Sequence, residues 1–126
     1  VIILLLTAIT LIVVPAKAEA PHKEFTKEEL QALSAYDDPQ GYAKILLDKE
    51  GFSNKEFKCL VTLWENESHW NYKADNPNST AYGIAQVLGE KSKEPATQIS
   101  NGIRYIIHRY ETPCNATAFW RKNYWY

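Results

Sequence analysis

The sequence predicts a small, mainly α domain with a loop or short hairpin beside one of its helices and one disulfide bond. Three observations support this fold class. Helix-start signals precede several segments of helical apolar periodicity, a stretch rich in turn residues separates two of them, and the chain has two cysteines. No repeat or low-complexity tract interrupts the sequence, so we expect one compact domain.

The first residues of the sequence are typical of a secretory signal. An apolar run over residues 1–14 is followed by Pro15 and by two overlapping small-x-small sites, at 16–18 and 18–20. The run is shorter than the roughly 20 residues that a membrane span needs. We therefore expect residues 1–18 to be removed and the protein to be secreted. An uncleaved membrane anchor is the alternative.

The charge of the chain argues against nucleic-acid binding. The full sequence carries 14 basic and 15 acidic residues, and loss of Lys17 with the signal would bring the net charge from −1 to about −2. Such a chain has no basic field that could hold a phosphate backbone. No nucleic-acid partner is therefore expected.

Two short helices are expected in residues 19–50, ahead of the main domain. A capping box at residues 26–29 begins the first, which should run to about Tyr36. An Asp-Pro pair at 38–39 begins the second, which should end at Gly51.

The main domain is expected over residues 51–126. A second capping box opens a helix over about 53–68, and the turn residues of 69–88 suit an ordered loop or a small hairpin. Another helical pattern runs from Pro95 and is ended by Pro113. The final stretch, 119–126, holds too many aromatic residues for a disordered terminus.

The two cysteines, Cys59 and Cys114, are expected to form a disulfide, because an even pair in an exported chain usually does. The bond would close a loop of about 56 residues, which is worth up to roughly 4 kcal/mol. The alternative is a reactive thiol or a metal-binding pair. No other His or Cys lies at a spacing that would support a metal site.

The helix over 53–68 carries two candidate catalytic carboxylates. At 100° per residue, Glu67 lies about 40° from the centre of the apolar face, whereas Glu65 lies about 120° away. Burial against apolar groups and the C-terminal end of the helix dipole would both raise the pKa of Glu67. A general acid for glycosidic bond cleavage needs such a shift. The alternative is a structural Glu held by hydrogen bonds.

A family resemblance bears on this choice. Glu-Ser at 67–68, followed by Ala-Tyr-Gly-Ile-Ala-Gln at 81–86, resembles the Glu-Ser … Gly-x-Gly-Leu-Met-Gln signature of the soluble lytic transglycosylases, which have a lysozyme-like fold. The segment 101–106 resembles that family's stretch ending in Gly-x-x-Tyr-Leu. Residues 51–126 as a whole are most similar to small secreted bacterial proteins with this domain.

Two departures from the family pattern leave assignments open. The interval between Glu and Gln is one residue longer than usual, so Asn76 and Ser79 compete for the position of the family's loop serine. The family's Ala-Tyr-Asn-Ala-Gly motif is absent. Its tyrosine could correspond to Tyr105, to Tyr110 or to one of the aromatic residues at the end of the sequence.

The resemblance implies a peptidoglycan lytic transglycosylase that acts on glycan strands as a monomer at the cell wall, without metal or cofactor. Glu67 would be its single acid/base group, and the products would carry 1,6-anhydro ends. The substrate-binding residues would be Gln86, Tyr82, Ser79, Asn76, Trp70 and Tyr105. The candidates for stacking on sugar rings are Trp70, Tyr72 and Tyr82, for which packing in a small core is the alternative.

Two other functions remain open at this point. Asp75 could supply a second carboxylate, which would make a hydrolytic muramidase the better interpretation. A cell-wall-binding module that keeps the fold but has lost useful catalysis is the other alternative.

Overall fold

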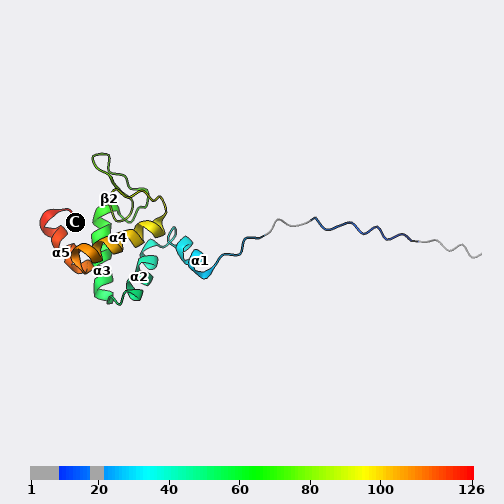
Figure 1. Ribbon diagram of the computed structural model, residues 1–126, viewed down its shortest axis with the longest axis horizontal. Helices are drawn as coiled ribbons and strands as arrows, with labels where there is room; N and C mark the ends of the chain where they lie inside the picture. The colour runs from blue at the N-terminus through cyan, green and yellow to red at the C-terminus, as the bar shows by residue number, and fades with distance from the viewer. Residues whose placement is uncertain (1–8, 18–21) are drawn as a thin grey trace, which may run out of the picture.

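The computed structural model describes residues 9–17 and 22–126 (Figure 1). The expected signal therefore falls partly outside the described residues, and its expected cleavage point after Ala18 lies outside them altogether. Residues 9–17 are exposed and form neither helix nor strand. Within the described ranges, no helix has the length and apolar character required to cross a membrane.

The mainly α fold class is confirmed, as are the short hairpin and the single disulfide. In the described part of the chain the elements are α1 (Lys27–Ser34), α2 (Pro39–Lys49), α3 (Asn54–Ser68), β1 (Ala81–Tyr82), β2 (Val87–Leu88), α4 (Pro95–Tyr110) and α5 (Pro113–Asn123). The two strands pair antiparallel, with Ala81 opposite Leu88 and Tyr82 opposite Val87.

The predicted starts of the first two helices are confirmed. Thr26 and Glu29 form a complete capping box at α1, because each side chain accepts a hydrogen bond from the backbone N–H of the other residue. The helix ends at Ser34, slightly earlier than predicted. At α2, the Asp38 carboxylate accepts from the N–H of Gly41 at 2.8 Å.

The predicted capping box of α3 is only half formed. The Ser53 hydroxyl accepts from the N–H of Glu56, at 3.4 Å. The Glu56 carboxylate does not complete the box, since it instead accepts a 2.7 Å hydrogen bond from the N–H of Cys114, in the first turn of α5. This negative charge lies at the positive end of the α5 dipole, so the tertiary contact takes the carboxylate away from its local role.

Helix α5 is not predicted from the sequence. Pro113 is expected only to end the preceding helix, but it also occupies the first turn of a new one, with Thr112 as its N-cap. The Thr112 hydroxyl accepts from the N–H of Asn115 at 3.1 Å. The turn between α4 and α5 is therefore short, and α5 folds back against α3 (Figure 1).

One hydrophobic core lies between α2, α3, α4 and α5. Helix α3 packs against α2 and α5, and α4 packs against the same two helices. The largest fully buried apolar side chains of this core are Trp64, Leu47, Leu60, Leu63, Ile84, Ile99 and Ile106. Because α2 contributes Ala43 and Leu47 to this core, the expected boundary at residue 50 does not separate two packing units. By contrast, α1 has no buried residue.

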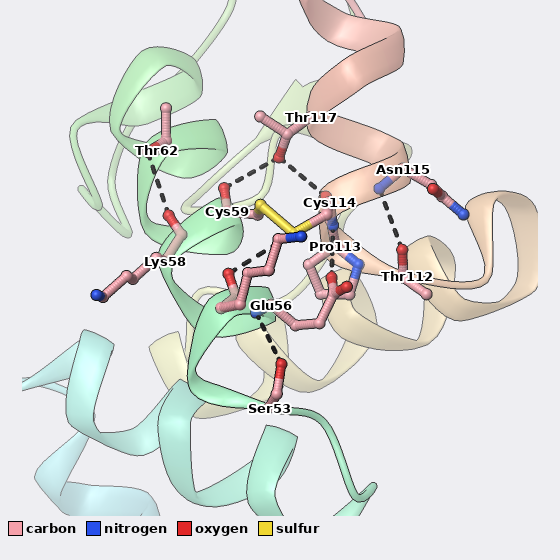
Figure 2. The surroundings of a disulfide bond; sticks show 11 residues. Ser53, Glu56, Lys58, Cys59, Thr62, Thr112, Pro113, Cys114, Asn115 and Thr117 are labelled. Carbon is pink, nitrogen blue, oxygen red and sulfur yellow. Dashed lines mark hydrogen bonds between the residues drawn. A yellow bond between two sulfur atoms is a disulfide. The ribbon is translucent and has the colours of Figure 1, made fainter.

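The disulfide joins the first half of α3 to the start of α5 (Figure 2). Cys59 and Cys114 have their Cα atoms 5.0 Å apart. Next to the bond, the Thr117 hydroxyl lies 3.0 Å from the carbonyl oxygen of Cys59 and 2.9 Å from that of Pro113, and it can donate to either. Together with the Glu56 contact, these bonds fix α5 along α3, the helix that carries Glu67.

Candidate functional site

The side chain of Glu67 lies in the last turn of α3 and is half-buried. Burial raises its pKa, and a hydrogen bond with the Trp120 side chain opposes this shift in part. The predicted inward orientation of Glu67 is therefore confirmed. A carboxyl group in this environment keeps its proton to a higher pH than an exposed one does.

Glu65 points the other way, as predicted. It is exposed, and its carboxylate lies 2.9 Å from Nδ1 of His69. His69 ends α3 in the left-handed conformation (φ 52°), and Trp70 follows with φ 58°. Two successive non-glycine residues with positive φ are costly, and such conformations concentrate at functional sites. The helix thus ends one residue after Glu67, and two residues with positive φ follow it.

The side chain of Glu67 lines a cavity of about 360 Å³. Three parts of the chain form its walls: the end of α3, the hairpin with the loop before it, and the segment after α5. We call residues 124–126 of this last segment the aromatic tail. The described lining residues are Glu67, Asn76, Ser79, Ala81, Gln86, Leu88, Tyr124, Trp125 and Tyr126. Of these, Glu67 alone carries a carboxylate side chain.

The hairpin turn is fixed to α3 and α4 by buried polar side chains. The Ser68 hydroxyl, next to Glu67, lies 2.6 Å from the carbonyl oxygen of Ile84 and donates to it. From α4, the buried Gln98 accepts from the N–H of Ile84 at 3.0 Å and donates to the carbonyl oxygens of Tyr72 and Ser92, both at 2.9 Å. All of these partners are backbone groups, so Ser68 and Gln98 hold the backbone of this region directly.

Gly83 lies against this Gln98 amide. It has a φ of +80°, and a Cβ atom there would lie only 2.2 Å from the Gln98 side-chain oxygen. The glycine of the Ala-Tyr-Gly-Ile segment is therefore needed both for its backbone conformation and for the close approach of α4.

Three of the predicted binding residues line the cavity. Gln86 has a positive φ of 53°, and its amide nitrogen donates to the carbonyl oxygens of Gly83 at 2.8 Å and Ala74 at 3.1 Å. With the nitrogen engaged in this way, the amide oxygen is the atom that Gln86 has left for a ligand. Asn76 and Ser79, which competed for one role, both line the cavity.

Trp70, expected to bind and stack on sugar, is instead a core residue. It is only 6% exposed, its indole nitrogen donates to the carbonyl oxygen of Val61 at 3.2 Å, and its ring meets that of Trp64 edge to face. A ring covered in this way cannot receive a sugar face. The expectation for Trp70 is therefore wrong, and the packing alternative holds there.

The other aromatic candidates lie outside the cavity lining. Tyr72 packs edge-on against Tyr36, with ring centroids 5.3 Å apart. The ammonium group of Lys93 lies over the ring of Tyr82, 3.2 Å from its centroid. Tyr105 does not line the cavity, and its ring meets that of Tyr126 edge to face, with the centroids 5.6 Å apart. None of the three is placed to touch a ligand beside Glu67.

Asp75 does not join Glu67. It is exposed, does not line the cavity, and forms an isolated antiparallel bridge with Tyr82 through its backbone. As for metals, the described ranges contain no group of three or more His, Cys, Asp or Glu side chains that could bind one.

The aromatic tail forms a larger part of the site than the sequence predicts, since its residues are expected only as one possible counterpart of the family's tyrosine. Within the tail, Tyr126 is bonded to the rest of the domain. The Tyr126 hydroxyl donates to the carbonyl oxygen of Ala85 at 2.5 Å and accepts from the indole nitrogen of Trp64 at 2.9 Å. Burial holds the pKa of this hydroxyl well above its usual value, so it acts as a neutral hydrogen-bonding group. Beyond that possible correspondence, the signal for the tail in the sequence is its density of aromatic residues.

Comparison with models of known protein families, with curated proteins and with solved structures gave no match for this chain.

Proposed function

We propose that the protein is a peptidoglycan lytic transglycosylase that cleaves the glycosidic bond after N-acetylmuramic acid with Glu67 as its single acid/base group. One observation carries the proposal: a half-buried carboxyl with a raised pKa opens into a cavity of about 360 Å³ whose other described lining residues carry no carboxylate. The motifs around 67–68 and 81–86, which resemble those of the transglycosylase family, supply the substrate class.

In the first step, the protonated Glu67 would donate its proton to the glycosidic oxygen while the bond from this oxygen to C1 of N-acetylmuramic acid breaks. Positive charge develops at C1, and the substrate's own acetamido oxygen would stabilise it. The raised pKa of Glu67 favours this step, because more of the carboxyl is protonated near neutral pH.

In the second step, the Glu67 carboxylate would accept the proton of the sugar's 6-hydroxyl as its oxygen attacks C1. The new O6–C1 bond closes the 1,6-anhydro ring and restores the protonated Glu67. Thus the same carboxyl acts first as acid and then as base.

The position of Asp75 supports this mechanism over hydrolysis. A hydrolytic glycosidase uses a second carboxylate about 5–9.5 Å from the first. Asp75 is exposed and does not line the cavity of Glu67. In the proposed mechanism the nucleophile is the sugar's own 6-hydroxyl. No water molecule has to be activated, so no second carboxylate is needed.

We also place the protein outside the cytoplasm, at the cell wall. The Cys59–Cys114 disulfide supports this location, because such bonds persist in oxidising compartments. The apolar run at the start of the sequence, interpreted as a secretory signal, agrees with it.

The decisive experiment compares the parent protein with Glu67→Gln and Glu65→Gln on purified peptidoglycan, with loss of turbidity as the measurement. Glu65→Gln is a matched control, because it changes an exposed carboxylate on the same helix two residues away. We expect the parent and Glu65→Gln to clear the suspension and Glu67→Gln to lose at least about 100-fold in rate. Equal rates for Glu67→Gln and the parent would overturn the proposal. Wall binding by all three without clearing would favour a binding module instead.

Mass spectrometry of the released fragments tests the chemistry separately. We expect 1,6-anhydro ends. These are lighter than hydrolysed ends by ~18 Da, the mass of the water molecule that a hydrolase adds. Reducing ends would mean that the enzyme is a muramidase.

A further inference from the structure

We propose that Trp125 of the aromatic tail, with Tyr124 beside it, is a stacking platform for an N-acetylhexosamine ring at the mouth of the Glu67 cavity. This inference rests on the proposed function and adds to it the residue that would hold one sugar of the glycan strand.

The platform residues are open to solvent at the site. Trp125 is 51% exposed and Tyr124 is 79% exposed, whereas the core residues Trp64 and Trp70 are 0% and 6% exposed. Both tail residues line the same cavity as Glu67. Large aromatic surface is normally buried in a folded domain, and exposed aromatic groups at a cavity are typical of ligand contact surfaces.

Although it is exposed, Trp125 is held in place by two neighbours. Phe119 of α5 meets it edge to face, with the ring centroids 4.9 Å apart and the planes at 80°. The guanidinium carbon of Arg109 lies 5.2 Å from the Trp125 centroid. The Arg109 side chain is in turn held along α4, because its guanidinium donates to the hydroxyl of Tyr105 at 2.8 Å. A ring fixed before binding loses little entropy when a ligand stacks on it.

The backbone places the platform between two fixed points. Tyr124 ends α5 in the left-handed conformation, with a φ of 60°, and its ring packs edge-on against Trp120 at 5.9 Å. Two residues later, the Tyr126 hydroxyl is bonded to Ala85 and Trp64. A bulky residue with positive φ is unfavourable by itself, so the surrounding contacts must maintain this turn. Between these two points, Trp125 lines the cavity.

The chemistry of the site fits a pyranose ring. The C–H groups on one face of an N-acetylhexosamine are apolar and pack on a flat aromatic ring. The polar edge would meet hydrogen-bonding groups, and the cavity offers Asn76, Ser79 and the amide oxygen of Gln86. Trp125 is neutral, so stacking on it requires no charge on the ligand. The structure thus assigns Trp125 to sugar binding and leaves the proton transfers to Glu67.

The test measures binding of the N-acetylglucosamine tetrasaccharide by titration calorimetry in the Glu67→Gln background, so that no cleavage occurs. Adding Trp125→Ala should weaken binding about tenfold, which corresponds to about 1.4 kcal/mol, whereas Trp125→Phe should retain most of the affinity. Phe25→Ala is the matched control, since it removes an exposed aromatic ring (46% exposed) that does not line this cavity, and it should leave binding unchanged.

A second readout is specific to Trp125 and does not depend on the alanine variant folding. The tetrasaccharide should shift the tryptophan fluorescence of the Glu67→Gln protein, and Trp125→Phe should abolish most of this shift while binding persists. Unchanged affinity in Trp125→Ala, an unchanged shift in Trp125→Phe, or no tetrasaccharide binding by the Glu67→Gln protein would each overturn the platform. Failure of the proposed function has a different signature, which is equal peptidoglycan clearing by Glu67→Gln and the parent.

Discussion

The indole nitrogen of Trp64 donates a 2.9 Å hydrogen bond to the hydroxyl of Tyr126, which in turn donates to the carbonyl oxygen of Ala85 at 2.5 Å. One phenol hydroxyl therefore joins the three walls of the cavity: α3, the hairpin turn and the aromatic tail. Glu67 lies one helical turn beyond Trp64, so this connection also fixes the depth at which the carboxyl is buried.

Replacing Tyr126 with Phe should destabilise the protein by about 1–3 kcal/mol. The substitution leaves the Trp64 N–H and the Ala85 carbonyl oxygen without this partner, and buried polar groups without partners carry that cost. Thermal unfolding measures the effect. Tyr124→Phe is the control, because Tyr124 is 79% exposed, and its melting temperature should stay close to that of the parent. Similar melting temperatures for the two variants would contradict the role of the Tyr126 hydroxyl.

Glu67→Gln should stabilise the protein at pH 7 and should do so much less at pH 4. The pKa of Glu67 is raised in the folded state, so folding favours its protonated form. Its contribution to stability is complete below the unfolded pKa of about 4.3 and is lost as the pH rises through the folded pKa. Gln stays neutral throughout, so the advantage of the variant grows over this window.

Melting temperatures of parent and variant at both pH values check this prediction. Glu65→Gln is again the control, since it replaces an exposed carboxylate of the same helix whose one described partner, His69, also lies at the surface. A stabilisation by Glu67→Gln that is as large at pH 4 as at pH 7 would contradict burial of the charge as the cause.

Local signals in the sequence were sufficient for the first helices and for the direction of Glu67. The caps at Thr26, Asp38 and Ser53 involve residues only three positions apart, and the inward face of α3 follows from helical periodicity alone. Both properties are decided within one or two turns of chain, where no tertiary information is needed.

What the sequence could not supply depends on contacts between distant residues. The Glu56 carboxylate completes a cap on α5, 58 residues away, and not on its own helix. Trp70 lies in a segment of turn residues, where an aromatic ring suits either a core position or a sugar platform, and its packing against Trp64 decides between them. The aromatic tail became part of the site because Tyr126 reaches Trp64 across 62 positions. The proposed role of Glu67 stays a prediction.

Reduction of the Cys59–Cys114 bond should lower the melting temperature and the activity together. The bond spans 55 positions and holds α5 along the first half of α3, so its loss can cost up to roughly 4 kcal/mol. Since α5 also carries the aromatic tail, the cavity wall should loosen at the same time. Unfolding and peptidoglycan clearing would be measured with and without dithiothreitol.

The Cys59→Ser, Cys114→Ser double variant is the matched control for the reductant. It should resemble the reduced parent and show no further response to dithiothreitol. Free thiols in the native protein, or a parent that keeps its melting temperature after complete reduction, would contradict the prediction.

Gly83→Ala should be far more damaging than Gly51→Ala, although both glycines have nearly the same positive φ, +80° and +82°. At Gly51, nothing lies within 4 Å of an added Cβ, so the cost is that of the backbone conformation alone, about 1–2 kcal/mol. At Gly83, the added atom would lie 2.2 Å from the Gln98 side-chain oxygen, which accepts from the N–H of Ile84. Moving that amide would disturb the hydrogen bonds that fix the hairpin turn.

We therefore expect Gly83→Ala to lose more than about 3 kcal/mol of stability, measured by denaturant unfolding, and to lose peptidoglycan clearing as well. Equal destabilisation by the two variants would mean that the turn adjusts freely, and that Gln98 does not position this wall of the cavity.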